Sequence, residues 1–500
     1  MNINNKNLHH LVELFAQWQP EKEFLFDDEK SFTSQGFLDK TEKVSGMLLK
    51  KGIKKGSVVV FRPERSLPST ILFFSLQYLG AIVFLTDSHD SIEDSLKLSS
   101  VKVTPDFCLL QENKETPWNP YTLIDKQGTK FSFSLSDDET DKIYFESYVQ
   151  EKDIKDPAIV IFTTGSTGLK KPVLLSQNNL IWASRLSASI DLYQENDIGI
   201  QLLPLYHIFG LFLIISALIT HHSLYYPRYK ECCFILHSIE KYRITRIDGV
   251  PTLYLSVVKK QKEIHADLSS LRIGMIGGGP SSPNQIDEIE KILGLTLIPV
   301  YGMTECLGIS SGRLDMSKEE RQTTIGRVFK ENEVILVDED HNEVQKGQIG
   351  QILVKCPTLM MKYYEDEKST EHILDANGYL HTGDLAYFDE KKLLHLCGRK
   401  KDLIVKGGEN LSPKKIEEAI LSLDYVDNVA VVGKKDDYYG EIPACLIVLA
   451  EGFDISAEKI KADLSDKLFK NEIPGVFAFA KQLPLTSNGK IDKNRVKEIL

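Results

Sequence analysis

The fold is decided around Ala158-Ile-Val-Ile-Phe162 and the segment directly after it, Thr163-Thr-Gly165-Ser-Thr-Gly168-Leu-Lys170-Lys171-Pro172. The first five residues are apolar and largely β-branched, which is typical of a buried strand. In the second segment, glycines let backbone N–H groups approach an anion, hydroxyls add donors and a lysine adds charge. This predicts a phosphate cradle, although a flexible turn would have the same composition. A Walker A loop does not fit, because Lys170 stands where that motif requires its second glycine.

The surrounding chain alternates strand and helix patterns. Before the quoted segment, Ser57–Phe61 and Ala81–Leu85 have strand patterns and Leu67–Gly80 between them has a helix pattern. This order indicates a parallel βαβ unit, and the alternation continues to about residue 310. Residues 111–157 are polar and interrupted by Pro and Gly, and we expect a solvated loop at 137–142.

The sequence pattern changes in the last third of the chain. Short strand patterns at 333–337, 351–355 and 392–396 are separated by polar turns, which predicts a small antiparallel unit or barrel. After Gly398, strand patterns at Val429–Val432 and Ala444–Leu449 alternate with helix patterns at Pro413–Leu421 and Ser456–Leu468, the latter with Ser456 as N-cap. This tail is therefore expected to be a separate α+β domain.

Composition excludes several classes of protein. A net charge of -11 over 500 residues argues against a protein that coats nucleic acid. The seven cysteines form no C-x-x-C pair, so neither a disulfide framework nor a zinc ribbon is indicated, and we expect a reducing, cytoplasmic location. The N-terminus lacks a secretory signal pattern. The longest apolar run, Ile208–Ile219, is too short to span a bilayer, so we expect a buried helix and no transmembrane segment.

Five further motifs follow along the chain, and each alone would fit a turn or a charged surface segment. A hydroxyl beside a carboxylate at the end of the strand pattern Leu295–Val300 suits a nucleotide–Mg²⁺ site. An aspartate after a Thr-Gly turn can accept from both hydroxyls of a ribose. The motifs are Gly277-Gly278-Gly279-Pro280, Tyr301-Gly302-Met303-Thr304-Glu305, Tyr379-Leu-His-Thr-Gly-Asp384, Gly398-Arg399-Lys400-Lys401-Asp402 and Pro484-Leu-Thr-Ser-Asn-Gly-Lys490-Ile-Asp-Lys-Asn-Arg495.

The six motifs, in this order from about residue 30 to the end, resemble the adenylate-forming superfamily of acyl-CoA synthetases, adenylation domains and firefly-type luciferases. The resemblance implies an α/β fold. A large N-terminal domain of stacked α/β subdomains with a small β-barrel-like subdomain would span 1–398, a hinge 399–402, and a mobile α+β C-terminal domain 403–500. It also implies that ATP activates a carboxylic acid as an acyl-adenylate, with release of pyrophosphate, before transfer to a thiol.

The resemblance also assigns roles to individual residues. Lys490, Thr304, Glu305 and His207 would be catalytic, Glu305 would hold Mg²⁺, and Lys401 would lie at the hinge. Two residues depart from the family pattern, Lys170 where Pro is usual and Pro172 where Gly is usual. The nucleotide-binding set would be Thr163, Thr164, Gly165, Ser166, Thr167, Gly168, Lys171, Gly278, Gly279, Tyr301, Gly302, Met303, Thr304, Asp384, Arg399 and Lys490.

The expected acid follows from His207, which stands among apolar residues where amino-acid-activating members usually carry an aspartate-bearing segment. The chain therefore resembles the fatty-acyl and aryl members. Coenzyme A is the expected acceptor because no carrier domain is appended, with the phosphopantetheine of a separate carrier protein as the alternative; Gly407 and Gly408 would border the thiol tunnel. The oligomeric state stays open. The acyl pocket would contain His207, Ile208, Gly277, Gly278, Gly302 and Met303.

Two other classes of function are weighed against this one. Gly308-Ile-Ser310-Ser-Gly312 matches the G-x-S-x-G pattern of hydrolases. That pattern needs a strand before it and a helix after it, and the polar segment that follows does not predict a core-facing helix. The other class is a catalytically inactive nucleotide-binding protein, against which the combination of Glu305, Asp384, Arg399 and Lys490 argues.

Overall fold

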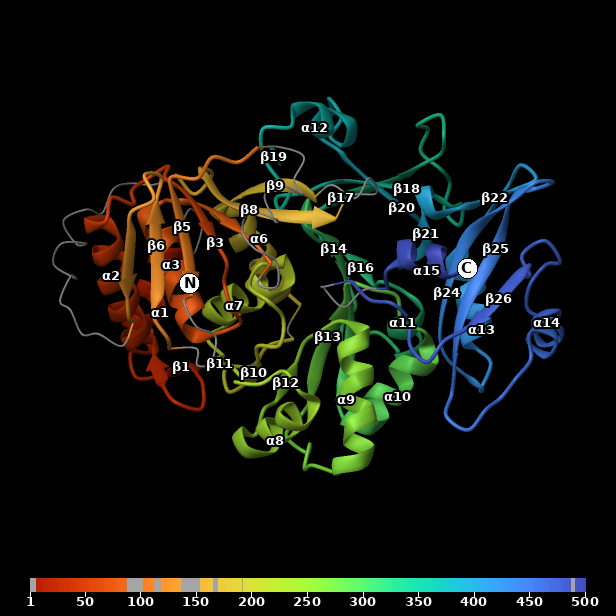
Figure 1. Cartoon of the computed structure of the whole chain (residues 1–500), viewed down its shortest axis with the longest axis horizontal. Coiled ribbons are helices and arrows are strands. Elements are labelled where there is room, and N and C mark those ends of the chain that lie inside the picture. Colours follow the sequence, from red (N-terminus) through yellow and green to blue (C-terminus); the bar gives the residue numbers. More distant parts are fainter. Residues whose placement is uncertain are drawn as a thin grey trace.

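The computed structural model describes residues 6–87, 102–111, 118–135, 153–164, 170–190, 192–486 and 491–500. The loop expected at 137–142 lies outside these residues. Two large mixed sheets and the helices around them form most of the molecule, and the C-terminal elements gather at its other end (Figure 1). This agrees with the expected α/β class and with a large N-terminal and a small C-terminal domain.

An eight-stranded sheet contains β8, the strand formed by the apolar run Ala158–Phe162. Its order is β19-β9-β8-β4-β3-β5-β6-β7, and β8, β4, β3 and β5 are parallel neighbours. The βαβ unit is confirmed, with α3 (Leu67–Leu79) between β3 and β4. Strands β6 and β7 fall in the polar stretch, where the pattern had not indicated them. The bounds are β3 Val58–Phe61, β4 Ile82–Leu85, β5 Phe107–Gln111, β6 Tyr121–Asp125, β7 Lys130–Phe133, β8 Pro157–Thr164, β9 Lys170–Ser176 and β19 Lys362–Tyr363.

A nine-stranded sheet carries the later motifs. Its order is β16-β15-β14-β13-β12-β10-β11-β1-β2, with parallel pairing from β14 to β1 and antiparallel strands at both ends. The bounds are β1 Glu23–Phe26, β2 Ser31–Thr33, β10 Ile198–Ile200, β11 Ser223–Tyr225, β12 Arg246–Ile247, β13 Ile273–Gly277, β14 Thr296–Met303, β15 Cys306–Ser311 and β16 Arg327–Val328.

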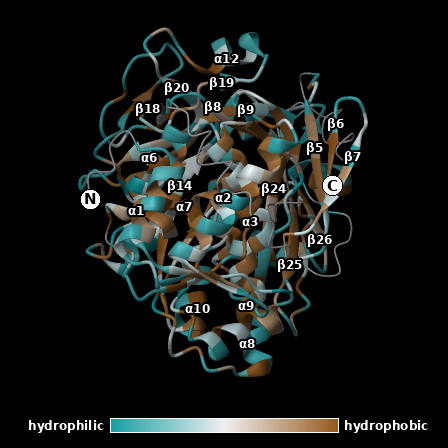
Figure 2. Ribbon diagram, turned by 90° about the vertical axis from the view of Figure 1, so that its left-hand side faces the viewer, coloured by the Kyte–Doolittle hydropathy of each residue, from teal (hydrophilic) through white to brown (hydrophobic). Residues whose placement is uncertain are grey.

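Helices pack between and outside the two sheets. All thirteen residues of α3 are buried, including the polar Ser69, Thr70, Ser75 and Gln77. The apolar run also forms the expected buried helix, α7. Figure 2 shows the hydrophobic residues concentrated in the inner strands and helices. The other bounds are α1 Leu8–Trp18, α2 Ser34–Lys50, α6 Gln177–Ala188, α7 Ile208–Thr220, α8 Cys232–Tyr242, α9 Pro251–Ile264, α10 Pro283–Leu293, α11 Lys318–Thr323 and α12 Glu367–Ile373.

The expected small antiparallel unit is a four-stranded sheet in the order β17-β18-β20-β21. The outer strands β17 and β21 are not paired with each other, so the unit is an open sheet rather than a barrel. A 3₁₀ turn, Lys400–Asp402, follows β21 directly. The bounds are β17 Glu333–Val337, β18 Gly350–Lys355, β20 Leu380–Phe388 and β21 Leu394–Arg399.

The C-terminal residues form a five-stranded sheet with its own core. Ser456 caps the expected helix by accepting from the N–H of Lys459, but α14 ends at Leu464, short of the expected Leu468. Within the described residues, no helix is long and apolar enough to cross a membrane. The bounds are β22 Ile404–Lys406, β23 Glu409–Leu411, α13 Pro413–Leu421, β24 Val426–Asp436, β25 Gly440–Leu449, α14 Ala457–Leu464, β26 Val476–Phe479 and α15 Lys493–Ile499.

Candidate functional site

The Tyr301–Glu305 motif lies on a hairpin rather than after a strand. Strand β14 continues through Met303, Thr304 and Glu305 form the turn, and β15 returns antiparallel from Cys306. Gly302 suits this position because a Cβ atom there would lie 3.0 Å from the carbonyl oxygen of Leu307 on the returning strand. The turn therefore presents Thr304 and Glu305 beyond the end of β14.

Asp384 joins this hairpin to the antiparallel sheet. The Tyr301 hydroxyl donates to Asp384 Oδ2 at 2.6 Å, and Arg399 Nε lies 3.0 Å from Asp384 Oδ1. Asp384 on β20 and Arg399 on β21 face each other in the strand register. Burial, and then the Asp384 carboxylate, raise the pKa of Tyr301 well above its usual value. Three motifs far apart in the sequence thus meet around one buried carboxylate.

Glu305 is a buried carboxyl group close to cationic side chains. Its Oε1 accepts from the Tyr363 hydroxyl at 2.8 Å, and Lys171 Nζ lies 5.0 Å from the centre of the Tyr363 ring. Burial raises the pKa of Glu305, and the hydrogen bond from Tyr363 and the charges of Arg399 and Lys171 oppose that rise. A cation beside this carboxyl group would offset the cost of burying its charge.

Lys401 lies in the turn directly after Arg399. Partial desolvation, and then the charge of Arg399, lower the pKa of the Lys401 ammonium, while Asp402 and Asp384 raise it. The predicted hinge residue is therefore within electrostatic range of the carboxylate that joins the hairpin and the antiparallel sheet.

Part of the predicted phosphate loop lies outside the described residues. Gly165, Ser166, Thr167, Gly168 and the Thr164 side chain belong to this part. Lys490, in the last of the six motifs, also lies outside the described residues. The flanks of the loop are described: β8 and β9 are antiparallel, and they pair Thr163 with Lys171. This pairing brings Lys171 back beside Thr163 and close to Tyr363.

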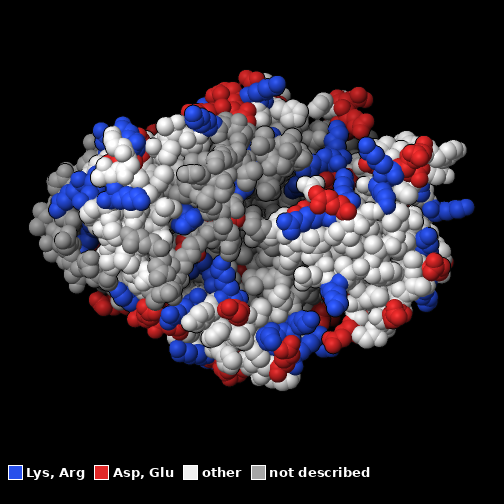
Figure 3. Space-filling model, viewed as in Figure 1, with Lys and Arg blue, Asp and Glu red and all other residues white. Residues whose placement is uncertain are grey.

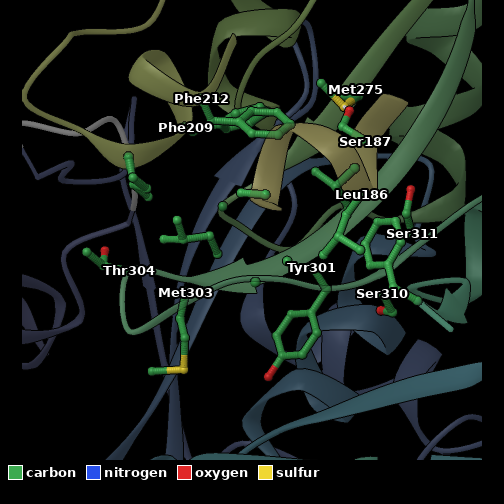
Figure 4. Close-up of a pocket in the computed structure, with 18 of the residues that line it drawn as sticks. Leu186, Ser187, Phe209, Phe212, Met275, Tyr301, Met303, Thr304, Ser310 and Ser311 are labelled. Atoms are coloured by element: carbon green, nitrogen blue, oxygen red, sulfur yellow. Dashed lines mark hydrogen bonds between the residues drawn. The ribbon is translucent and has the colours of Figure 1, made fainter. Parts of the chain in front are cut away.

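A cavity of about 120 Å³ begins at the β14–β15 hairpin and extends between α6, α7 and β13. In Figure 4, Met303 and Thr304 lie at the opposite side of the pocket from Ser310 and Ser311, and the Tyr301 hydroxyl points away from it. The lining residues are Ala183, Leu186, Ser187, Ile190, His207, Ile208, Phe209, Phe212, Met275, Gly278, Val300, Tyr301, Gly302, Met303, Thr304, Leu307, Gly308, Ser310, Ser311 and Phe329.

Five of the six residues predicted for the acyl pocket line this cavity, namely His207, Ile208, Gly278, Gly302 and Met303. Gly277 does not line it. A Cβ atom at Gly277 would lie 2.6 Å from Val300 Cγ2, so this glycine serves close packing between β13 and β14. Gly279, predicted to bind the nucleotide, also lies outside the lining, beside the ring of Pro251.

Helix α6 supplies lining residues that the sequence reasoning missed. Ala183, Leu186 and Ser187 have the spacing i, i+3, i+4, which places them on one face of α6, and Ile190 lies two residues beyond the end of this helix. That spacing is visible in the sequence, but an apolar helix face most often packs against a core. Phe329 had no comparable signal.

His207 is the N-cap of α7, and its backbone lies in the extended region. Its Nδ1 accepts from the Phe209 N–H at 3.2 Å. In the neutral ring this places the proton on Nε2. The cap thus fixes the orientation of the imidazole at the cavity wall.

The hydrolase alternative is wrong on geometry. Ser310 lies within strand β15, paired on both sides, and is fully buried. Its hydroxyl donates to the carbonyl oxygen of Ile325 at 2.7 Å. A nucleophile elbow requires a serine exposed at a sharp turn between strand and helix, and this position is the opposite of that arrangement.

Basic side chains lie around the site, with acidic side chains among them. Figure 3 shows Lys and Arg side chains on both sides of the hollow at the middle of this face, where the two parts of the molecule meet. Despite the net charge of -11, the molecule therefore offers local cations to an anionic ligand.

Two protein-family models match this chain. Residues 12–364 match the model described as "AMP-binding enzyme", and residues 415–490 match "AMP-binding enzyme C-terminal domain". A 2-succinylbenzoate–CoA ligase of Bacillus cereus (strain Q1) is 28% identical over 98% of this chain and 99% of its own length. A long-chain-fatty-acid–CoA ligase of Bacillus subtilis (strain 168) is 24% identical over 99% of this chain and 95% of its own length.

Solved structures share the fold. The ATP-bound RpMatB-BxBclM chimera B1 matches with a TM-score of 0.83 and 23% identity, covering 99% of both chains. The Bacillus subtilis O-succinylbenzoate coenzyme A synthetase (MenE) in complex with AMP matches with a TM-score of 0.79 and 24% identity, covering 97% of this chain and 98% of that one. These similarities confirm the two-domain α/β architecture.

Proposed function

The chain belongs to the family of AMP-binding enzymes, and on that basis we propose that it activates a carboxylic acid with ATP and transfers the acyl group to coenzyme A. The acid would attack the α-phosphorus of ATP, giving acyl-adenylate and pyrophosphate. The thiol would then displace AMP. The observation that carries the proposal is the buried Asp384, held between Tyr301 and Arg399 beside an apolar cavity.

Asp384 would hold the ribose. Each of its oxygens already accepts one hydrogen bond or ion pair, and a carboxylate oxygen can accept two. One acceptor site per oxygen therefore remains for the two ribose hydroxyls. Thr304, at the turn of the hairpin, would bond the α-phosphate, and Lys171 would contact the phosphates.

Glu305 would hold Mg²⁺, which would neutralise the phosphate charge that otherwise repels the carboxylate of the acid. The residues fit this ion. Glu305 is a buried carboxyl group whose pKa is raised by burial, and its side chain accepts a hydrogen bond from the neutral Tyr363 hydroxyl. An oxygen ligand of this kind is the type that Mg²⁺ prefers.

We propose that 399–402 is the hinge between an N-terminal domain, 1–398, and a C-terminal domain, 403–500. Lys490, close to the end of the mobile domain, would bring its cation to the reacting carboxylate during adenylation only. Rotation about Lys401 would then withdraw Lys490 and bring Gly407 and Gly408 to the thiol tunnel. Such a rotation excludes water from a reactive mixed anhydride.

The acid would be a monocarboxylic acid with an apolar body. None of the described residues that line the cavity is Asp, Glu, Lys or Arg, so neither an ammonium nor a second carboxylate would find an opposite charge. Two arginines lie behind the lining but are already bound. Arg246 forms a bidentate ion pair with Asp248, with hydrogen bonds of 2.7 and 2.8 Å. Arg313 donates to the carbonyl oxygen of Ser311 at 2.6 Å.

Burying an unpaired charge costs several kcal/mol, which would discriminate by roughly 10²-fold or more. The names of several relatives specify 2-succinylbenzoate, which has two carboxylates. We therefore propose that this chain differs from those relatives in its acid. Both relatives described above are named as CoA ligases, which supports coenzyme A rather than a carrier protein as the acceptor.

Matched pairs of acids test this proposal through ATP–pyrophosphate exchange. Octanoate and octanedioate differ by the second carboxylate, and 3-phenylpropanoate and phenylalanine differ by the ammonium. We expect exchange with the first member of each pair and thioester formation when coenzyme A is added. Exchange driven better by octanedioate or phenylalanine would refute the assigned acid class. Failure of every acid would refute adenylation.

A further inference from the structure

The ring of Phe329 forms part of the cavity wall on the side away from the proposed reacting end. In Figure 4, Ser310 and Ser311 lie at the opposite side of the pocket from Thr304, which would bond the α-phosphate. Phe329 belongs to the far side, because its backbone N–H donates to the carbonyl oxygen of Ile309 at 3.1 Å, next to Ser310. The body of a bound acid would therefore extend towards Phe329.

Packing holds the Phe329 ring in this wall. The side chain is only 6% exposed and belongs to one apolar cluster with Leu186 and Met275. A Cβ atom at Gly308 would lie 3.6 Å from Phe329 Cε2, so the ring lies against backbone that carries no side chain. The first glycine of the Gly308–Gly312 segment, for which the hydrolase role was wrong, thus leaves room for this ring.

A guanidinium group lies beside the same ring. Arg313 Cζ is 4.9 Å from the centre of the Phe329 ring, and Arg313 is not among the described residues that line the cavity. Phe329 therefore contacts both the cavity and this cation. An aromatic face attracts a cation but supplies no oxygen acceptor for its five N–H donors.

Arg313 has no carboxylate partner within the part of the chain that the structure describes. Its Nη1 donates to the carbonyl oxygens of Ser311 and Gly312 at 2.6 and 3.0 Å. These contacts use one of the three guanidinium nitrogens, and among the described residues Nε and Nη2 have no hydrogen-bond partner. Two donors thus remain in the geometry that a carboxylate accepts as a pair of parallel hydrogen bonds.

The two carboxylates whose charges act on Arg313 pair with other cations. Asp315 lies 2.7 Å from Arg327. Glu331 lies 3.7 Å from Lys330. Burial, and then the charge of Arg327, lower the pKa of Arg313 to about 10, against the opposing effect of both carboxylates. Arg313 remains a cation at neutral pH, and its partly buried charge would gain from an anionic partner.

We propose that Phe329 determines which acids the cavity accepts by separating it from Arg313. With the ring in place, this side of the cavity carries no charge and rejects a second carboxylate. Without the ring, the far end of a dicarboxylic acid would meet the guanidinium, whose planar fork matches a carboxylate. The inference rests on the proposed function, because that function places the reacting carboxylate at the opposite side of the cavity.

Matched variants test this separation through ATP–pyrophosphate exchange. Octanoate is paired with octanedioate and decanoate with decanedioate, and kcat/KM for each diacid is divided by that for its monoacid. We expect Phe329→Ala to raise this ratio roughly 10-fold or more above the wild-type value, because a charge-assisted contact replaces an unpaired charge. Phe212→Ala is the control, since it removes an aromatic ring from the lining at α7 and should leave the ratio unchanged.

The role of the cation is tested in the same assay. Arg313→Met alone should keep the wild-type ratio, whereas combining it with Phe329→Ala should abolish the gain. Thermal denaturation verifies folding, and Phe329→Val, which keeps part of the packing, replaces Phe329→Ala if the latter does not fold. Equal ratios for the Phe329 and Phe212 variants, or a gain that survives Arg313→Met, would overturn the proposal.

The results distinguish this inference from the proposed function. Wild-type exchange with the monoacids, without a gain in any Phe329 variant, would refute only the role of Phe329. Absence of exchange with every acid would refute the proposed function, and calorimetric titration with decanedioate would still test the site. We expect Phe329→Ala to bind this diacid and the double variant not to bind it; the same result for both proteins would overturn the inference.

Discussion

Replacing Asp384 with asparagine removes the charge at the centre of the proposed ribose site and keeps the shape of the side chain. The amide oxygen can still accept from the Tyr301 hydroxyl, which lies 2.6 Å from the carboxylate in the wild type. The amide nitrogen would then face Arg399, donor against donor. Because the Arg399 side chain is 52% exposed, it can turn to water, and the fold should survive.

The expected loss follows from the hydrogen bonds to the nucleotide. A hydrogen bond to a charged group contributes about 1.5–3 kcal/mol, against about 0.5–1.5 kcal/mol for a neutral one. Two ribose hydroxyls bound to Asp384 would therefore lose about 2 kcal/mol together. At about 1.4 kcal/mol per tenfold change, kcat/KM for ATP should fall about 30-fold.

ATP–pyrophosphate exchange at saturating acid and varied ATP measures this loss, and thermal denaturation verifies folding. Asp389→Asn is the matched control, since Asp389 lies on the same β20–β21 hairpin but binds His395 at 3.0 Å. The control should retain wild-type kinetics. If Asp384→Asn kept its kcat/KM for ATP while correctly folded, Asp384 would not contact the nucleotide and the proposed site would be wrong.

Three other substitutions test the remaining roles. Burial raises the pKa of Glu305, so ionising this group destabilises the fold as the pH rises past the ordinary carboxyl range. Glu305→Gln should therefore make the metal-free protein at least as stable near neutral pH, with an advantage that shrinks on acidification, yet lower exchange at limiting Mg²⁺; urea denaturation and Mg²⁺ titration check both. Lys401→Pro should impair thioester formation more than adenylation, because proline stiffens the hinge; equal loss of both steps would count against this hinge. Lys490→Ala should slow adenylation by roughly 10²–10³-fold but spare thioester formation from supplied acyl-adenylate; wild-type adenylation would exclude the role of Lys490.

Local patterns in the sequence were sufficient for much of the architecture. The apolar β-branched runs became β3, β4 and β8, and the apolar run from Ile208 became the buried helix α7. These features depend on near neighbours in the chain, because periodicity and burial are set over a few residues. The order of six motifs indicated the family for the same reason, since each motif is a short segment.

What an individual residue contacts could be told only from its position on or beside a strand in the folded structure. Gly277 and Gly278 are adjacent, yet Gly278 lines the cavity and Gly277 packs against Val300. Side chains alternate between the two faces of a strand, so a shift of one residue changes what a position contacts. The sequence showed three glycines but not which of them borders the cavity.

Contacts between distant segments were decided by tertiary structure alone. Tyr301 meets Asp384 across 83 residues, and Tyr363 meets Glu305 across 58 residues. The sequence by itself determined the strands, helices and chemical groups available to the site. Which groups meet depends on how the sheets pack and in which register their strands pair, and this is set by burial of the whole core rather than by any local pattern.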